Sequence, residues 1–304
     1  MKTNPNTILV LFVSVILIGY FFKRIKILQL EDSRSIINLI LYFTLPAVVL
    51  KTFYKASLSF SLLLIFLASL GFGIMMTIAG IFLFKNHLKK NKKGLLISSC
   101  IGFNIGLFAY PFVQAFWGRE GLLNIAMFDL ANAFVVFGAS YAVAAIYSPN
   151  TKEISYAYIA KKLLLFVPLQ SYMLAILFVF MNVTYPDIIL DFIDIVSKAN
   201  TVLVLLVIGM FLSFKIEKQT FIETLKVLSL RYTLGMITGV LLYIFLNEPK
   251  AIKNTIALGL ILPVGMSAIP YSVLFDYDRE LAGTLVNISN VLSFILMWVL
   301  ITFL

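Results

Sequence analysis

GFNIGLFAYP at residues 102–111 and PVGMSAIPY at residues 263–271 are two short stretches that combine Gly and Pro with single polar residues. Asn104 lies seven residues before Pro111, and Pro263 lies seven residues before Pro270. Both stretches fall in longer apolar runs. Proline removes a backbone donor there, and glycine weakens the helix further. We therefore expect two helices that are interrupted at matching places.

The composition identifies the solvent in which these helices lie. Of the 304 residues, 61% are hydrophobic and only 12% are charged, whereas a soluble domain has about half apolar and a quarter charged residues. The formal net charge of +10 comes from basic residues in short connections, so no nucleic-acid partner is expected. One Cys and one His predict no metal site, and no cofactor is expected.

Ten apolar runs are long enough, or nearly so, to cross a bilayer as a helix. They cover residues 7–22, 36–54, 58–84, 95–117, 121–147, 159–181, 190–213, 225–246, 254–275 and 280–303. Most of the 24 Lys and Arg residues follow the odd-numbered spans, Arg231 being counted in the connection after the seventh. The positive-inside rule then places both termini outside. We expect an all-α, multi-pass protein of the plasma or inner membrane.

The two stretches belong to an internal repeat. Each is followed by an Arg-Glu pair and then by a helix with polar residues three apart, which are Asp129 and Asn132 in one half and Asn287 and Asn290 in the other. Five helices separate the copies, so the copies must run in opposite directions across the membrane. We predict two inverted five-helix repeats, residues 1–150 and 151–304, a common plan of secondary transporters.

The chemistry of such a crossing favours an anion. Half-helix N-termini near the midplane offer unpaired N–H groups and positive dipole ends, so a small organic anion is the expected substrate. Asp129, Asn132, Asn287 and Asn290 are expected to face this crossing as supporting or ion-coupling residues. An Asp within a membrane usually has a partner or a role, and Asp129 would suit proton exchange. A structural acid and interhelical amide bonds are the plainer alternatives.

The same motifs resemble the auxin efflux carrier family. The resemblance covers GFNIGLFAYP, WGREG at 117–121, FDLAN at 128–132, LPVGMSAIP at 262–270 and INLILYFTLP at 37–46. It implies ten helices, with helices 1, 2, 6 and 7 as a scaffold that contains Asn38 and Pro46. Helices 3–5 and 8–10 would form a transport domain with crossed helices 4 and 9. The resemblance implies that the substrate-binding residues of the crossover are Asn104, Pro111, Pro263, Ser267 and Pro270. One departure is Val202, which stands where the family often has a second scaffold proline.

The resemblance also implies a function and partners. Family members move malate-like, malonate-like or auxin-like acids, by elevator-type alternating access. Partners would be the anion, membrane lipid and a second copy bound through scaffold helices. A sodium-coupled symporter, a cation/proton antiporter and a non-transporting receptor are the alternatives. An enzyme is not expected, because no nucleophile–base or metal cluster is evident within the apolar runs.

Overall fold

The computed structural model describes residues 4–86, 89–149, 156–213 and 218–303. The described residues form α-helices and three short π-helical segments, named η1–η3. The elements are α1 Pro5–Arg24, α2 Asp32–Leu39, η1 Ile40–Thr44, α3 Leu45–Phe53, α4 Phe60–Phe84, α5 Lys90–Cys100, η2 Ile105–Ala109, α6 Tyr110–Phe134, η3 Val135–Ser140, α7 Tyr141–Ile146, α8 Tyr156–Leu164, α9 Val167–Phe180, α10 Asp187–Phe211, α11 Lys218–Phe245, α12 Lys250–Gly259, α13 Ala268–Leu274 and α14 Arg279–Phe303.

Seven helical runs among the described residues are long and apolar enough to cross a membrane. One of them, residues 105–146, changes direction at Gly118, where φ is 58° and ψ is −145°. The shorter helices α5, α9, α12 and α13 lie in the remaining predicted ranges. The expectation of an all-helical polytopic membrane protein is confirmed.

Two prolines follow π-helical segments. Pro46 comes directly after η1 and Leu45, and Pro111 comes directly after η2 and Tyr110. Each proline occupies the first turn of the α-helix that follows. Because the ring excludes an α-helical hydrogen bond to the carbonyl four residues earlier, the preceding turn widens instead of continuing as a regular α-helix.

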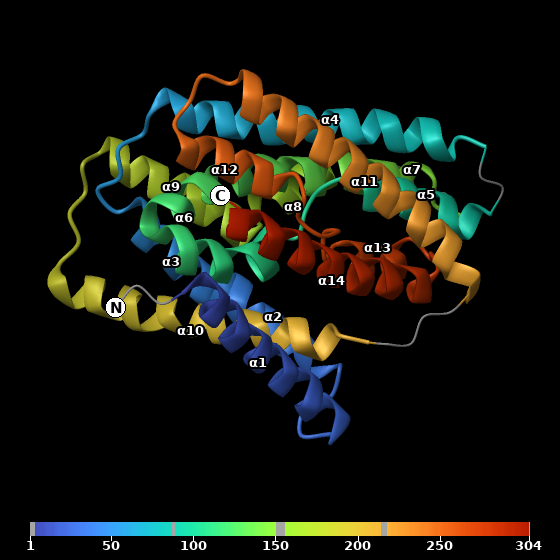
Figure 1. The fold of residues 1–304 in the computed structure, drawn as a ribbon, viewed down its shortest axis with the longest axis horizontal. Helices are drawn as coiled ribbons and strands as arrows, with labels where there is room; N and C mark the ends of the chain where they lie inside the picture. Colours follow the sequence, from blue (N-terminus) through green and yellow to red (C-terminus); the bar gives the residue numbers. More distant parts are fainter. Residues whose placement is uncertain (1–3, 87–88, 150–155, 214–217, 304) are drawn as a thin grey trace.

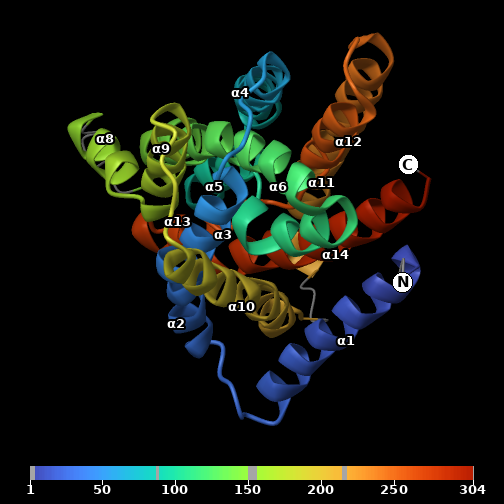
Figure 2. The ribbon, with the colours of Figure 1, turned by 90° about the vertical axis from the view of Figure 1, so that its left-hand side faces the viewer.

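The long helices divide into two groups. Helices α1, α3, α9 and α10 contact one another, and α4, α5, α6, α11, α12 and α14 form the second group. Figure 1 shows α4 along one side of the molecule and α1 with α10 along the opposite side, and Figure 2 shows the same separation from the end.

Helices α1 and α10 approach each other closely through two glycines. A Cβ atom at Gly19 would lie 2.4 Å from the Leu206 carbonyl oxygen, and one at Gly209 would lie 2.0 Å from that of Ile16. Small residues allow membrane helices this close approach.

The start of α1 and the end of α14 lie at the same end of the molecule. The Trp298 indole Nε1 donates a hydrogen bond of 3.0 Å to Asn6 Oδ1. The first and last long helices are therefore joined near the two ends of the chain.

Candidate functional site: the crossing of two broken helices

Two interrupted helices cross at the centre of the second group. Helix α5 ends at Cys100 and the chain is not helical again until Ile105; helix α12 ends at Gly259 and α13 begins at Ala268. Gly102 has a φ of +76°, a conformation that glycine adopts without strain. Within the breaks, Phe103 and Val264 form an antiparallel bridge.

The two breaks are joined by a direct backbone hydrogen bond. The Asn104 N–H donates to the Pro263 carbonyl oxygen at 3.0 Å. Further groups are held by the helices that follow each break. Asn132 Oδ1 accepts from Phe103 N at 2.8 Å and Asn132 Nδ2 donates to Phe103 O at 3.0 Å, while Ser289 Oγ accepts from Val264 N at 3.1 Å. Buried backbone groups that leave a helix need such partners.

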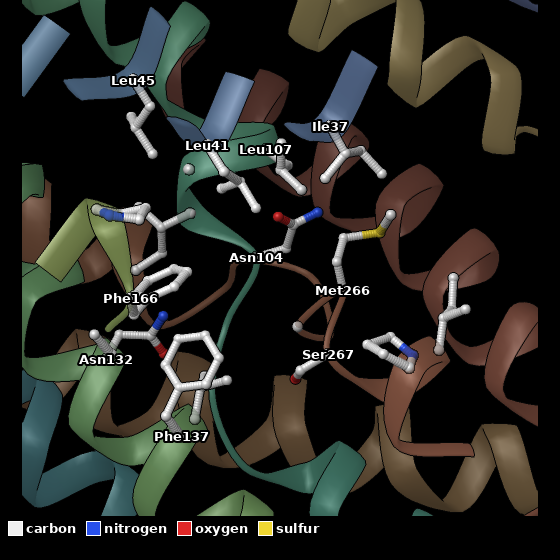
Figure 3. Close-up of a pocket in the computed structure, with 18 of the residues that line it drawn as sticks. Ile37, Leu41, Leu45, Asn104, Leu107, Asn132, Phe137, Phe166, Met266 and Ser267 are labelled. Atoms are coloured by element: carbon white, nitrogen blue, oxygen red, sulfur yellow. The ribbon is translucent and has the colours of Figure 1, made fainter. Parts of the chain in front are cut away.

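A cavity of about 980 Å³ opens beside the crossing. Its wall combines both breaks with α2, the start of α9 and part of α13. Figure 3 shows Asn104 at one break and Ser267 at the other, with Ile37, Leu41 and Leu107 on the surrounding wall. The wall is mainly apolar, with a few polar groups brought together at the breaks, an arrangement typical of small-molecule sites.

Asp129 is buried at the edge of this cavity. Its Oδ2 accepts a hydrogen bond of 2.7 Å from the Tyr172 hydroxyl, and its Oδ1 lies 3.4 Å from Asn132 Nδ2. The Tyr172 hydroxyl also bonds the Tyr110 hydroxyl. The carboxyl group is thus linked to α9 on one side and to the break on the other.

Basic residues border the same cavity. The exposed side chains of Arg34, on α2, and Lys161, on α8, both contribute to its wall. Asp129 is the only acidic residue among those that line it in the described part of the chain. The cavity therefore carries more positive than negative groups, which attracts anions.

The structure brings some of the expected residues to the cavity. Those on its wall are Asn38, Asn104, Asp129, Asn132, Ser267 and Pro270. Pro46 and Pro111 lie off the wall and follow the π-helical segments. Pro263 is buried behind the wall, where its carbonyl group joins the breaks.

Asn287 and Asn290 lie elsewhere, contrary to the expectation that they face the crossing. Asn287 binds the backbone N–H and C=O of Ser213, just beyond α10. Asn290 is buried away from the cavity wall. The face of α14 that meets the break carries smaller residues instead: Ser289 holds Val264, and Ser293 donates to the Ile261 carbonyl at 2.7 Å.

Arg231 is the residue that sequence reasoning missed. The residue does not lie in a connection, because α11 continues from Lys218 to Phe245 and leaves Arg231 only 2% exposed. Its guanidinium group donates to carbonyl oxygens of both breaks. The sequence feature that could have revealed it is a single arginine inside the predicted span 225–246. A charged residue within a membrane helix often marks a functional position.

Comparison with known proteins agrees with this architecture. A family model described as "Membrane transport protein" matches residues 6–301. The chain belongs to this family, that of the auxin efflux carriers. It is therefore a transporter and not an enzyme.

Two relatives have a similar length. An uncharacterised transporter of Methanocaldococcus jannaschii is 26% identical over 312 residues, which cover 98% of this chain and 99% of the relative. A second uncharacterised transporter, from Methanothermobacter thermautotrophicus, is 22% identical over 296 residues and covers 96% of this chain and 95% of its own length.

Proposed function

We propose that this protein is a secondary active transporter of small organic anions, such as malate-like or malonate-like carboxylates or auxin-like weak acids. The observation that carries the proposal is the hydrogen-bonded crossing of two broken helices beside a large cavity. The segments that follow each break begin on the cavity wall, at Ile105 and at Ser267. First-turn N–H groups lack intrahelical partners, so those at the start of η2 can bind a carboxylate. At the start of α13, the N–H groups of Ala268 and Ile269 already donate to the carbonyl oxygens of Gly265 and Met266.

The proposed architecture has ten membrane helices in two inverted repeats, residues 1–150 and 151–304. Local geometry supports this pairing of the halves. Each half contains an interrupted helix, and each break is held by a polar side chain from the next long helix, Asn132 in α6 and Ser289 in α14. An inverted repeat of this kind places a binding site near the bilayer midplane.

Transport would proceed by an elevator-type movement of one helix group against the other. The group of α1, α3, α9 and α10 would be the scaffold, and the group that holds the crossing would move. At the cavity wall, Tyr172 of α9 donates a hydrogen bond to Asp129 of α6. Away from that wall, Arg119 Nε of α6 donates to the Thr52 carbonyl oxygen of α3 at 3.1 Å. Such contacts can break and re-form as the groups slide.

The cavity would open to the cytoplasm in this conformation. Arg34 and Lys161 on its wall belong to connections that the positive-inside rule assigns to the cytoplasm. Asp129 would carry a coupling proton, because a neutral carboxyl group beside the crossing leaves its positive potential available to the anion. Both termini would then lie outside the cell membrane.

A binding screen tests the substrate class. Purified protein in detergent would be heated with matched mono-, di- and tricarboxylates, and with the corresponding amides as uncharged controls. A bound ligand stabilises the folded state by mass action, so at least one carboxylate should raise the Tm while its amide does not. Stabilisation by amides or amines alone would contradict an anion site.

A further inference from the structure

The broken helices present negative as well as positive ends to the crossing. Helices α5 and α12 both end there, and the last carbonyl groups of a helix lack intrahelical partners and carry a partial negative charge. Arg231 donates hydrogen bonds to two carbonyl oxygens at the end of α5, those of Ser99 at 3.2 Å and Cys100 at 2.7 Å. It also donates to three carbonyl oxygens of the unwound segments, those of Gly102 at 2.8 Å, Leu262 at 3.2 Å and Pro263 at 3.2 Å.

The charge of Arg231 is balanced by these dipoles and not by a carboxylate. Among the described residues, no salt bridge includes Arg231. Its guanidinium carbon lies 4.7 Å from the centre of the Phe103 ring, which adds a cation–π contact. An isolated buried charge is expensive, so the converging carbonyl groups form a cation site that the protein fills with its own side chain.

Unwound carbonyl groups and half-helix C-termini are the groups that hold Na⁺ or H⁺ in transporters built on broken helices. We propose that Arg231 is a tethered cation that occupies this position permanently, so that anion transport by this protein requires no Na⁺ or other metal cation. The inference rests on the proposed function for its transport consequence, but the cation site itself can be tested without transport.

The role differs from that of an ordinary structural arginine. Arg231 would act on the electrostatic potential at the crossing. Its charge neutralises the carbonyl groups on one side, so the positive potential of the helix N-termini on the cavity side is not cancelled. A purely structural clamp depends on the planar hydrogen-bonding shape of the guanidinium group, so lysine and glutamine would fail equally at position 231. Retention of function by the cationic Arg231→Lys and not by the neutral Arg231→Gln is therefore the property that separates the two roles.

The first experiment measures thermal stability of Arg231→Ala in detergent with guanidinium, Na⁺ or K⁺ at low concentration, against choline at the same ionic strength. A guanidinium ion fits the space and the carbonyl groups that the substitution frees, so it should raise the Tm of the variant and not that of the wild type. Lys23→Ala is the matched control, because Lys23 Nζ donates to the Leu212 carbonyl at 2.5 Å, at the end of α10 and away from the crossing.

The expected result is a rise in Tm for Arg231→Ala with guanidinium, smaller or absent with Na⁺ and K⁺, and no rise for Lys23→Ala. Equal responses of the two variants would overturn the proposal. If Arg231→Ala accumulates only when guanidinium is present during purification, that dependence also supports it. If Arg231→Ala never accumulates, the comparison of anion uptake by Arg231→Lys and Arg231→Gln tests the proposal instead.

The second experiment measures anion uptake in proteoliposomes with Na⁺ replaced by choline. Wild-type uptake should be unchanged, Arg231→Lys should retain part of it, and the neutral Arg231→Gln should lose at least tenfold unless a cation is added. A requirement of the wild type for Na⁺, or equal uptake by the Lys and Gln variants, would refute the tethered cation. If the wild type moves no anion, the proposed function fails, while the stability experiment still decides whether Arg231 fills a cation site.

Discussion

Asn104 combines a backbone role with a free side chain at the crossing. Its backbone N–H donates a hydrogen bond to the Pro263 carbonyl oxygen. Its side-chain amide has no hydrogen-bond partner among the described residues. Figure 3 shows that side chain at the cavity. The amide is therefore available to a ligand, and the assignment of Asn104 to the crossover site stays a prediction.

We expect Asn104→Ala to weaken binding of the transported anion about 10- to 100-fold, because a hydrogen bond to a charged group contributes about 1.5–3 kcal/mol. The backbone bond to Pro263 does not need the side chain, so the protein should still fold. The measurement is the ligand concentration that gives half-maximal thermal stabilisation. An unchanged value would remove the Asn104 amide from the site.

The proposed proton coupling through Asp129 predicts that anion uptake depends on pH. In Asp129→Asn the side chain has no ionisable proton but retains an oxygen that can accept from Tyr172. We expect uptake by this variant to lose its response to an imposed pH gradient while anion binding persists. The check is uptake over a series of external pH values. A profile identical to that of the wild type would leave Asp129 with a structural role only.

Arg231 shows the limit of residue-level prediction. The predicted span 225–246 contains Arg231, but its charge was counted with the preceding connection and no role was assigned to it. Only the tertiary structure shows that carbonyl groups from two distant segments, around Cys100 and Pro263, converge on it. The sequence does not reveal this convergence, because every residue has a backbone carbonyl group and none of them is marked as a partner of Arg231.

At the scale of single elements, the breaks could be predicted but not placed. Proline and glycine marked the interrupted segments correctly. The breaks themselves lie before Pro111 and Pro270, because proline is accommodated in the first turn of a helix, where no internal N–H bond is lost. The amide pair of α14 failed as a prediction because three-residue spacing defines a shared face but not its direction.

The elements that follow the breaks predict unequal effects on stability. Asn132→Ala leaves both backbone groups of Phe103 without their partner, whereas Ser289→Ala frees only the N–H of Val264. A buried unsatisfied group costs about 1–3 kcal/mol. We therefore expect the larger drop in Tm for Asn132→Ala. Thermal unfolding of both variants in detergent provides the comparison, and a larger loss in Ser289→Ala would contradict this account of the breaks.

At the scale of the whole molecule, the proposed ten crossings and the positive-inside rule predict that both termini lie outside the cell. The Trp298–Asn6 hydrogen bond, which brings the start of α1 beside the end of α14, is compatible with that proposal. A tag at either terminus should react with a membrane-impermeant reagent in intact cells. Protection of both tags would invert the proposed orientation, and protection of one alone would contradict the fold.

Composition and apolar runs were sufficient to predict a helical membrane protein. The hydrophobic effect acts on whole segments and depends little on which apolar residue occupies each position. The cavity was not predictable. Its wall draws on α2, α9, α13 and both breaks, so its size and charge depend on how distant elements pack. The mainly apolar wall with two basic residues fits organic anions as a class without selecting one of them.

The central claim is that the crossing moves small organic anions. Its most direct test is uptake of radiolabelled carboxylates into proteoliposomes, with and without an imposed pH gradient, by the wild type and by Asn104→Ala at equal reconstituted amounts. The account predicts saturable uptake of at least one carboxylate by the wild type, stimulated by the gradient and reduced at least tenfold in the variant. Absence of uptake of every acid by folded wild-type protein, or uptake that Asn104→Ala leaves unchanged, would contradict it.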